Sequence, residues 1–210
     1  MNVDRCLTKK VIDLGALALR LSRVERITFH PNGRRPETDS DHSVMLGLIA
    51  PAFAARFFPK LNPNRVAALA LVHDLPEAYA GDTPTLKITP AQLAAKRMKE
   101  GLATDRIVEE FGDAFPWLTQ TLVDYEAQVE PEARFVKALD KLLPKVTHVL
   151  NNGATFDTVH GDMTRDDLVR RYARQIAELE AYASDFPELF ELRAHLVGMV
   201  LDRIPEGVGA

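Results

Sequence analysis

The residues best suited to chemistry lie in the segment 71–84, which reads LVHDLPEAYAGDTP. An apolar stretch leads into His73 and Asp74, and helical spacing places Glu77 on the same side of the chain one turn later. The glycine that follows permits a turn that can return Asp82 towards the same place. Burying these ionisable groups beside an apolar helix is costly unless they are paired or bind a cation. We therefore expect a divalent metal site, because imidazole and carboxylate ligands without thiolate suit Mn²⁺, Fe²⁺, Co²⁺, Ni²⁺ or Zn²⁺.

Two distant residues can complete such a site. His42 lies near the start of a helix expected over 41–58, and Asp140 lies on the apolar face of a helix expected over 132–150. Neither is informative alone, since Asp140 can also be explained by a surface pair with a neighbouring lysine. A His-Asp dipeptide by itself is also a weak signal, because a hydrogen-bonded pair at a helix end explains it more readily than a metal site does. The signal lies in the order of all four groups along the chain.

That order resembles the H…HD…D signature of the HD-domain metal-dependent phosphohydrolases. The residues that carry the signature are His42, His73, Asp74 and Asp140. The block HDLPEAYAGDTPTLK, which begins at residue 73, is similar to the 5′-deoxynucleotidase branch of that superfamily. So is the arrangement of Arg26 ahead of an Asp-His-Ser triplet at 41–43. The resemblance extends over about residues 17–150.

The resemblance implies one divalent ion (Co, Mn, Zn, Ni, Fe or Mg) bound by those four ligands. In that branch, a glutamate at the place of Glu77 acts on the attacking water beside the metal-binding aspartate at the place of Asp74. An aspartate at the place of Asp82 holds the sugar and discriminates against a ribose 2′-hydroxyl. An arginine before the first ligand binds phosphate; Arg26 is the candidate, and Arg23 is the alternative.

Two more residues are candidates for substrate binding. Lys87 can stabilise charge on the phosphoryl oxygens. The family's arginine is commonly followed by a tryptophan that packs on the nucleotide, and Phe29 is the next aromatic residue here. The expected substrate is a small-molecule nucleotide, and the expected reaction converts deoxyribonucleoside 5′-monophosphates to deoxynucleosides and phosphate. The alternatives are a deoxynucleoside triphosphohydrolase or another HD-type phosphate-ester hydrolase, and a non-enzymatic helical module with a structural metal.

Helical spacing dominates the whole chain, and the alternation of β-branched residues that marks strands is absent. We predict an all-α fold: a single compact HD-domain helical bundle over 1–210, with its core at about 17–150 and C-terminal helices at 165–203. Asp39 or Ser40 is expected to cap the helix over 41–58. Prolines at 51 and 144 are expected to bend their helices. Further helices are expected over 63–79, 91–101, 104–111 and 117–128.

Composition excludes several other classes of protein. The chain has 210 residues, 46% of them hydrophobic, which suffices for a core without disulfides. Its net charge of −4 argues against binding a nucleic-acid polymer, and the single Cys6 excludes a cysteine-rich zinc site. The uncharged stretch 44–55 is too short to span a membrane. We expect a cytoplasmic protein, with a homodimer implied by the resemblance. Basic residues such as Lys96 are expected on solvated helix faces.

Overall fold

The computed structural model describes residues 3–85, 88–159 and 164–204, and it confirms the predicted all-α class. The helices run in chain order as α1 (Arg5–Leu21), α2 (Asp39–Phe57), α3 (Pro63–Val72), α4 (Glu77–Ala80), α5 (Pro90–Phe111), α6 (Pro116–Ala127), α7 (Pro131–Asp140), α8 (Leu143–Leu150), α9 (Ala154–Val159), α10 (Arg165–Ala183) and α11 (Pro187–Leu201). Of these described helices, none has both the length and the apolar character needed to cross a lipid bilayer.

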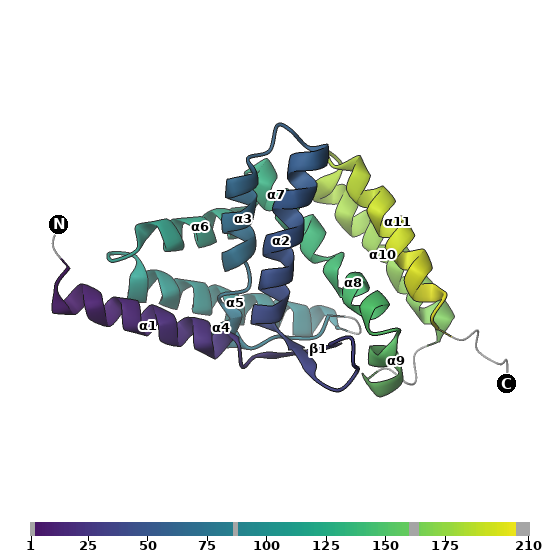
Figure 1. The fold of residues 1–210 in the computed structure, drawn as a ribbon, viewed down its shortest axis with the longest axis horizontal. Helices are drawn as coiled ribbons and strands as arrows, with labels where there is room; N and C mark the ends of the chain where they lie inside the picture. The colour runs from purple at the N-terminus through teal and green to yellow at the C-terminus, as the bar shows by residue number, and fades with distance from the viewer. Residues whose placement is uncertain (1–2, 86–87, 160–163, 205–210) are drawn as a thin grey trace.

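The helices α2, α3 and α7 form the centre of the molecule (Figure 1). The two helices α2 and α3 lie side by side and share the most extensive contact between any two elements. On one side of them lie α1, α5 and α6, and on the other side lie α8, α10 and α11 (Figure 1). The central trio therefore packs against helices on both flanks, as expected for the inner elements of a bundle.

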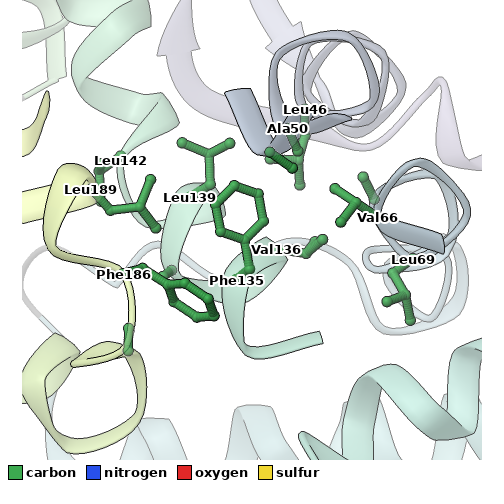
Figure 2. Packing of buried hydrophobic residues seen from close by; sticks show 14 of the residues in the cluster. Leu46, Ala50, Val66, Leu69, Phe135, Val136, Leu139, Leu142, Phe186 and Leu189 are labelled. Carbon is green, nitrogen blue, oxygen red and sulfur yellow. The ribbon is translucent and has the colours of Figure 1, made fainter. Parts of the chain in front are cut away.

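An apolar core locks the middles of these three central helices together (Figure 2). Phe135 of α7 is fully buried, and its ring meets those of Phe58 and Phe186 edge-on at centroid distances of 5.4 and 5.3 Å. Removing such a buried ring costs about 3–5 kcal/mol of stability. The other labelled members of the cluster come from α2, α3, α7, α11 and the segments beside them: Leu46, Ala50, Val66, Leu69, Val136, Leu139, Leu142 and Leu189. The core thus fixes the elements that end at the candidate site.

A short β-hairpin precedes α2, and the expectation that strands are absent is wrong here. Strands β1 (Glu25–Phe29) and β2 (Pro36–Thr38) pair antiparallel, with Glu25 opposite Thr38 and Phe29 opposite Pro36. The strands are too short for alternation to stand out, although β1 reads ERITF and is rich in β-formers. Gly33 supplies a φ of +64° in the connecting loop.

Two of the expected helices are divided in the structure. The helix expected over 63–79 ends at Val72, and a turn separates it from α4. The helix expected over 132–150 is interrupted after Asp140 and restarts as α8. Pro144 lies in the first turn of α8, where its missing N–H is tolerated, rather than bending a continuous helix. Both breaks occur where candidate site residues are found.

Other boundaries differ in smaller ways. The single helix α5 runs through the expected boundary at Gly101. Helix α2 begins earlier than expected and is capped by Thr38, not by Asp39 or Ser40. It continues through Pro51 to Phe57. These differences follow from local chemistry: the Thr38 hydroxyl accepts the Asp41 N–H in a capping box, which fixes the first turn of α2.

Candidate metal centre

Four side chains from distant parts of the chain converge on one point. Nε2 of His42 lies 2.9 Å from Oδ1 of Asp140 and 3.9 Å from Oδ2 of Asp74. Nε2 of His73 lies 3.1 Å from Oδ2 of Asp74 and 3.8 Å from Oδ1 of Asp140. The two imidazole rings have centroids 5.4 Å apart. The structure therefore brings together all four residues expected to share an ion.

Helix ends place these side chains. His42 lies in the first turn of α2, behind the capping box of Thr38 and Asp41. His73 is the C-cap residue of α3, and Asp140 is the last residue of α7. Because the three helices are clamped at their middles by the apolar core, their ends hold the ligands at fixed separations.

The surroundings of His73 leave one ring nitrogen available. Its Nδ1 lies 2.9 Å from the carbonyl oxygen of Ala70, an acceptor that keeps the proton on Nδ1. Its Nε2 is buried and has no hydrogen-bond partner among the described residues. The ring of Tyr125 packs against the imidazole of His73, with ring centroids 5.8 Å apart and ring planes at 76°. A buried nitrogen with a free lone pair is what a metal ligand provides.

His42 faces carboxylates through both ring nitrogens. Nε2 meets Asp140 as described, and Nδ1 lies 3.4 Å from Oε1 of Glu37. Burial and the charge of Arg26 would lower the pKa of His42, but the two carboxylates outweigh them and raise it to about 9. For Asp74 the directions are reversed. Burial alone would raise its pKa, but the neighbouring His73 and Arg26 hold the pKa well below its ordinary value.

The donor separations and the local charge both fit a divalent cation. Ligand atoms around an ion with bonds of about 2.1 Å lie roughly 3–4 Å apart, which matches the distances above. The described carboxylates around the point outnumber the permanent cations. The carboxylates are Glu37, Asp39, Asp74, Glu77, Asp82 and Asp140, and the cations are Arg26, Lys96 and Lys141. The raised pKa values of Glu77 and His42 reduce this negative charge, and a divalent ion would offset the part that stays ionised.

Glu77 lies beside these ligands in the first turn of α4. Its Oε1 accepts a hydrogen bond from Lys96 Nζ at 2.9 Å, and its Oε2 has no partner among the described residues. Burial and the charges of Asp74 and Asp39 raise the pKa of Glu77 to about 10. The expectation that Lys96 lies on a solvated helix face is wrong, because only 15% of its side chain is exposed.

Arg26 reaches the same cluster from β1. Its Nη1 donates to Oδ1 of Asp39 at 2.9 Å and to Oδ2 of Asp74 at 3.1 Å. Arg23, the alternative phosphate-binding residue, is exposed in the turn after α1. Asp39, Asp74 and Glu77 form a second cluster, which shares Asp74 with the four candidate ligands. One carboxylate oxygen from each lies within 4.8 Å of the others.

Asp82 also approaches the site. Gly81 has a φ of +74°, which turns the chain after α4. Asp82 is half-buried beyond this turn. Burial raises its pKa, and the charges of Arg26 and Asp74 act on it with opposite signs, so that it lies within electrostatic reach of both. The turn expected at Gly81 is therefore present.

Phe29 and Lys87 are the two remaining substrate candidates. Phe29 is half-buried at the end of β1, where the register of the hairpin is irregular. The carbonyl oxygen of Phe29 accepts a hydrogen bond from Asn151. Lys87 lies outside the described residues. The roles of both residues in substrate binding stay predictions.

Several residues of the site were not singled out from the sequence. Asp39 is fully buried, and its position one helical turn before His42 is a signal that could have identified it. Glu37 and Lys96 carry no such signal, because the packing of β2 and of α5 against the site brings them in. Lys141 donates to Oδ2 of Asp140 at 2.7 Å, which is the ion pair with a neighbouring lysine that the sequence also suggested. The other oxygen, Oδ1, faces the two histidines, so both expected arrangements are present.

Part of this chain is similar in sequence to proteins named 5′-deoxynucleotidases. Over 130 residues it is 35% identical to the 5′-deoxynucleotidase of Erwinia tasmaniensis and to the 5′-deoxynucleotidase YfbR of Salmonella newport. The match covers 58% of this chain in both cases, and 66% and 65% of the two relatives. It therefore spans slightly less than two thirds of the relatives' own length.

Solved structures and a family model cover more of the chain. A predicted metal-dependent phosphohydrolase of Magnetospirillum magnetotacticum is similar with a TM-score of 0.70 and 25% identity, over 93% of this chain and 96% of the other. A conserved hypothetical protein of Pyrococcus furiosus shares the fold, with a TM-score of 0.59, 21% identity and coverage of 88% and 98%. The model of the HD domain matches residues 18–182, which reaches into α10, beyond the segment on which the resemblance rested. The chain belongs to the HD-domain family.

Proposed function

We propose that this protein is a metal-dependent phosphohydrolase that converts deoxyribonucleoside 5′-monophosphates to deoxynucleosides and phosphate. The observation that carries the proposal is the convergence of His42, His73, Asp74 and Asp140 on one point, where the buried Nε2 of His73 faces Asp74 without a hydrogen bond to any described residue. The names of the deoxynucleotidase relatives and of the phosphohydrolase with the similar fold support the reaction class.

One divalent ion would be held by these four residues. When bound, it would supply positive charge against the phosphoryl oxygens and increase the acidity of water, which is what hydrolysis of an anionic phosphate ester requires. The donor set of two imidazoles and two carboxylates accommodates Co, Mn, Zn, Ni, Fe or Mg, and metal analysis of the purified protein would distinguish them.

Arg26 is the residue we assign to the substrate phosphate. Both of its hydrogen bonds to described residues use Nη1, so Nη2 and Nε are available to a phosphoryl oxygen. The pairs with Asp39 and Asp74 orient the guanidinium before substrate arrives, which lowers the entropic cost of binding. Arg23 is a weaker candidate, because it is exposed and outside this cluster.

Glu77 is placed to move a proton during hydrolysis. Its Oε1 is held by Lys96, while Oε2 is buried and free to exchange a proton with the attacking water or with the leaving 5′-oxygen. Asp82, beyond the turn at Gly81, is assigned to the sugar. A carboxylate there can accept a hydrogen bond from the 3′-hydroxyl of the sugar. If it also leaves no room for a 2′-hydroxyl, it would explain a preference for deoxyribose.

A panel of phosphate esters tests the proposal. We expect phosphate release from deoxyribonucleoside 5′-monophosphates in the presence of Mn²⁺, Co²⁺ or Mg²⁺, and its loss when a chelator is added. Faster turnover of deoxynucleoside triphosphates, with release of triphosphate, would replace this assignment by a triphosphohydrolase. No turnover of any ester would favour a binding module with a structural metal.

A further inference from the structure

Glu37 is a buried carboxylate that touches His42 and joins three elements. It lies on β2, outside the HD signature, and only 4% of its surface is exposed. Burying a carboxylate is unfavourable unless its oxygens are hydrogen-bonded or face a positive group. The two oxygens of Glu37 have different surroundings.

One oxygen of Glu37 is fixed from two sides. Oε2 accepts a hydrogen bond from Thr28 of β1 at 2.6 Å and another from Thr147 of α8 at 3.1 Å. Both threonines are buried, each with 5% of its surface exposed. These two hydroxyls hold the carboxylate in one orientation, because they approach it from separate elements.

The other oxygen faces His42. Oε1 is buried, has no hydrogen-bond partner among the described residues, and lies 3.4 Å from Nδ1 of the imidazole. Since Nε2 of the same ring points at the other candidate ligands, a proton on Nδ1 is the only state in which Nε2 can give its lone pair to an ion. Glu37 is placed to stabilise that state.

The two candidate histidine ligands differ in this respect. Nδ1 of His73 meets a neutral backbone carbonyl, that of Ala70, whereas Nδ1 of His42 meets a carboxylate. A carboxylate behind a ligating imidazole orients the ring and makes its free nitrogen more basic. His42 is thus set up to be the stronger donor of the pair.

We propose that Glu37 is a positioning residue for the metal: it holds His42 in the Nδ1-protonated form and raises the affinity of the site for a divalent ion. The proposal rests on the proposed function, since it assumes that His42 ligates an ion. It assigns no contact with substrate to Glu37. Thr28 and Thr147 contribute to this positioning, because their hydrogen bonds to Oε2 fix the direction of Oε1.

The variant Glu37→Gln separates this role from a purely structural one. Glutamine keeps the size of the side chain and can still hydrogen-bond both threonines, but it has no negative charge. We expect the dissociation constant for Zn²⁺ or Mn²⁺, measured by isothermal titration calorimetry, to rise about 10- to 100-fold. We also expect turnover to recover when the metal concentration is raised to saturation, because no reacting group has been lost.

A spectroscopic signature provides a second reading. In the zinc-loaded, nitrogen-15-labelled protein, the Nδ1 proton of His42 should resonate further upfield in Glu37→Gln than in the wild type. The amide oxygen accepts from the threonines, so the group that faces Nδ1 is an NH2 donor and no longer accepts its proton. The Nδ1 proton of His73 should not move, since its acceptor is the Ala70 carbonyl. A change in packing alone would not select one imidazole in this way.

Thr155→Val serves as the matched control. Thr155 is fully buried and accepts a hydrogen bond from Asn151, so its loss perturbs a buried polar contact without touching a candidate ligand. Its metal affinity should equal that of the wild type. Unchanged affinity in Glu37→Gln, or an equal loss in Thr155→Val, overturns the proposal while the phosphatase activity of the wild type still supports the proposed function. A wild-type protein that binds no ion overturns both.

Discussion

At the scale of single residues, three of the four candidate ligands have one atom directed to the shared point and another held by its surroundings. His73 is held through Ala70, His42 faces Glu37, and Asp140 is held through Lys141. Such outer contacts fix the direction of a ligand's lone pair, so an ion meets a prepared site. Substituting a ligand atom and substituting a nearby proton carrier should therefore have different consequences.

Removing a ligand should abolish metal retention and activity together. We expect His73→Ala and Asp74→Ala to be purified without stoichiometric metal and to show no phosphate release, as measured by elemental analysis and a phosphate assay. His195→Ala, which changes an exposed histidine of α11, is the control and should behave like the wild type. Full activity in either ligand variant would contradict the assigned centre.

Removing Glu77 should separate metal binding from turnover. Because its Oε2 is positioned to exchange a proton, Glu77→Ala should keep the metal and slow turnover by about 10²- to 10⁴-fold. The measurement is kcat at saturating metal, together with metal content. Glu100→Gln is a suitable control, since Glu100 shares the partner Lys96 but is partly exposed. Normal turnover in Glu77→Ala would remove the role assigned to Glu77.

The sequence allowed some of these residues to be found and not others. Asp140 stood out because a charged residue on an apolar helix face is unusual, and His42 stood out through its order in the signature. Glu37 and Lys96 did not, because a buried carboxylate on a two-strand hairpin and a basic residue in a charged helix look like ordinary surface residues. Their burial depends on contacts across more than 15 residues of chain, which local spacing cannot reveal.

At the scale of elements, α8 carries an unusual group behind the centre. Lys145 is buried, with its Nζ donating to the carbonyl oxygen of Lys141 at 3.0 Å and to Oε1 of Gln175 at 2.9 Å. Burial and the charges of Arg193 and Arg171 lower the pKa of Lys145 from 10.5 to about 7. The helix that follows the candidate ligand Asp140 thus contains a lysine that resists protonation.

This lysine predicts a pH dependence of stability with a definite sign. Between pH 7 and 10.5 the unfolded chain binds a proton at Lys145 that the folded chain does not, so the free energy of unfolding rises with pH in that window. The slope from this group is at most about 1.4 kcal/mol per pH unit. Lys145→Met should flatten the profile measured by urea denaturation in the presence of chelator at pH 7, 8 and 9.

A surface lysine provides the comparison for that experiment. Lys99 is exposed on α5, so Lys99→Met should leave the slope of the wild type unchanged. An equal slope in Lys145→Met and the wild type would show that Lys145 takes up its proton normally in the folded state.

Helices could be predicted from the sequence where apolar residues recur at helical spacing over a long segment. The long helical segments that became α10 and α11 were located from the spacing of apolar residues. The break between α7 and α8 was not, because a proline can bend a helix or start a new one, and packing around Leu142 decides between them. The hairpin was missed because five- and three-residue strands are too short to show a period.

At the scale of the whole molecule, the candidate centre joins the three central helices, whose own contacts are apolar (Figure 2). An ion bound only by the folded chain stabilises it by mass action. The surplus of carboxylates around the point adds to this effect, because their repulsion is relieved when the ion is present. The stability of the protein should therefore depend on the metal.

Metal removal should lower the melting temperature. With free ion at 100 times its dissociation constant, the stabilisation is about 2.7 kcal/mol. Thermal denaturation followed by circular dichroism, with Mn²⁺ or Co²⁺ and then with excess chelator, measures the shift. Asp74→Ala should show the same melting temperature in both conditions. Identical melting of the wild type with and without the ion would contradict a site that spans α2, α3 and α7.

The location of the candidate ligands at helix termini has a consequence for how this scaffold can change. An axial slide of one helix by a single residue's rise, about 1.5 Å, displaces its terminal side chain by a distance comparable to a metal–ligand bond. Apolar substitutions at positions such as Leu46 or Val136, which never meet the ion, set that slide. Preference for one ion over another can thus drift through the hydrophobic interior while every coordinating residue stays the same.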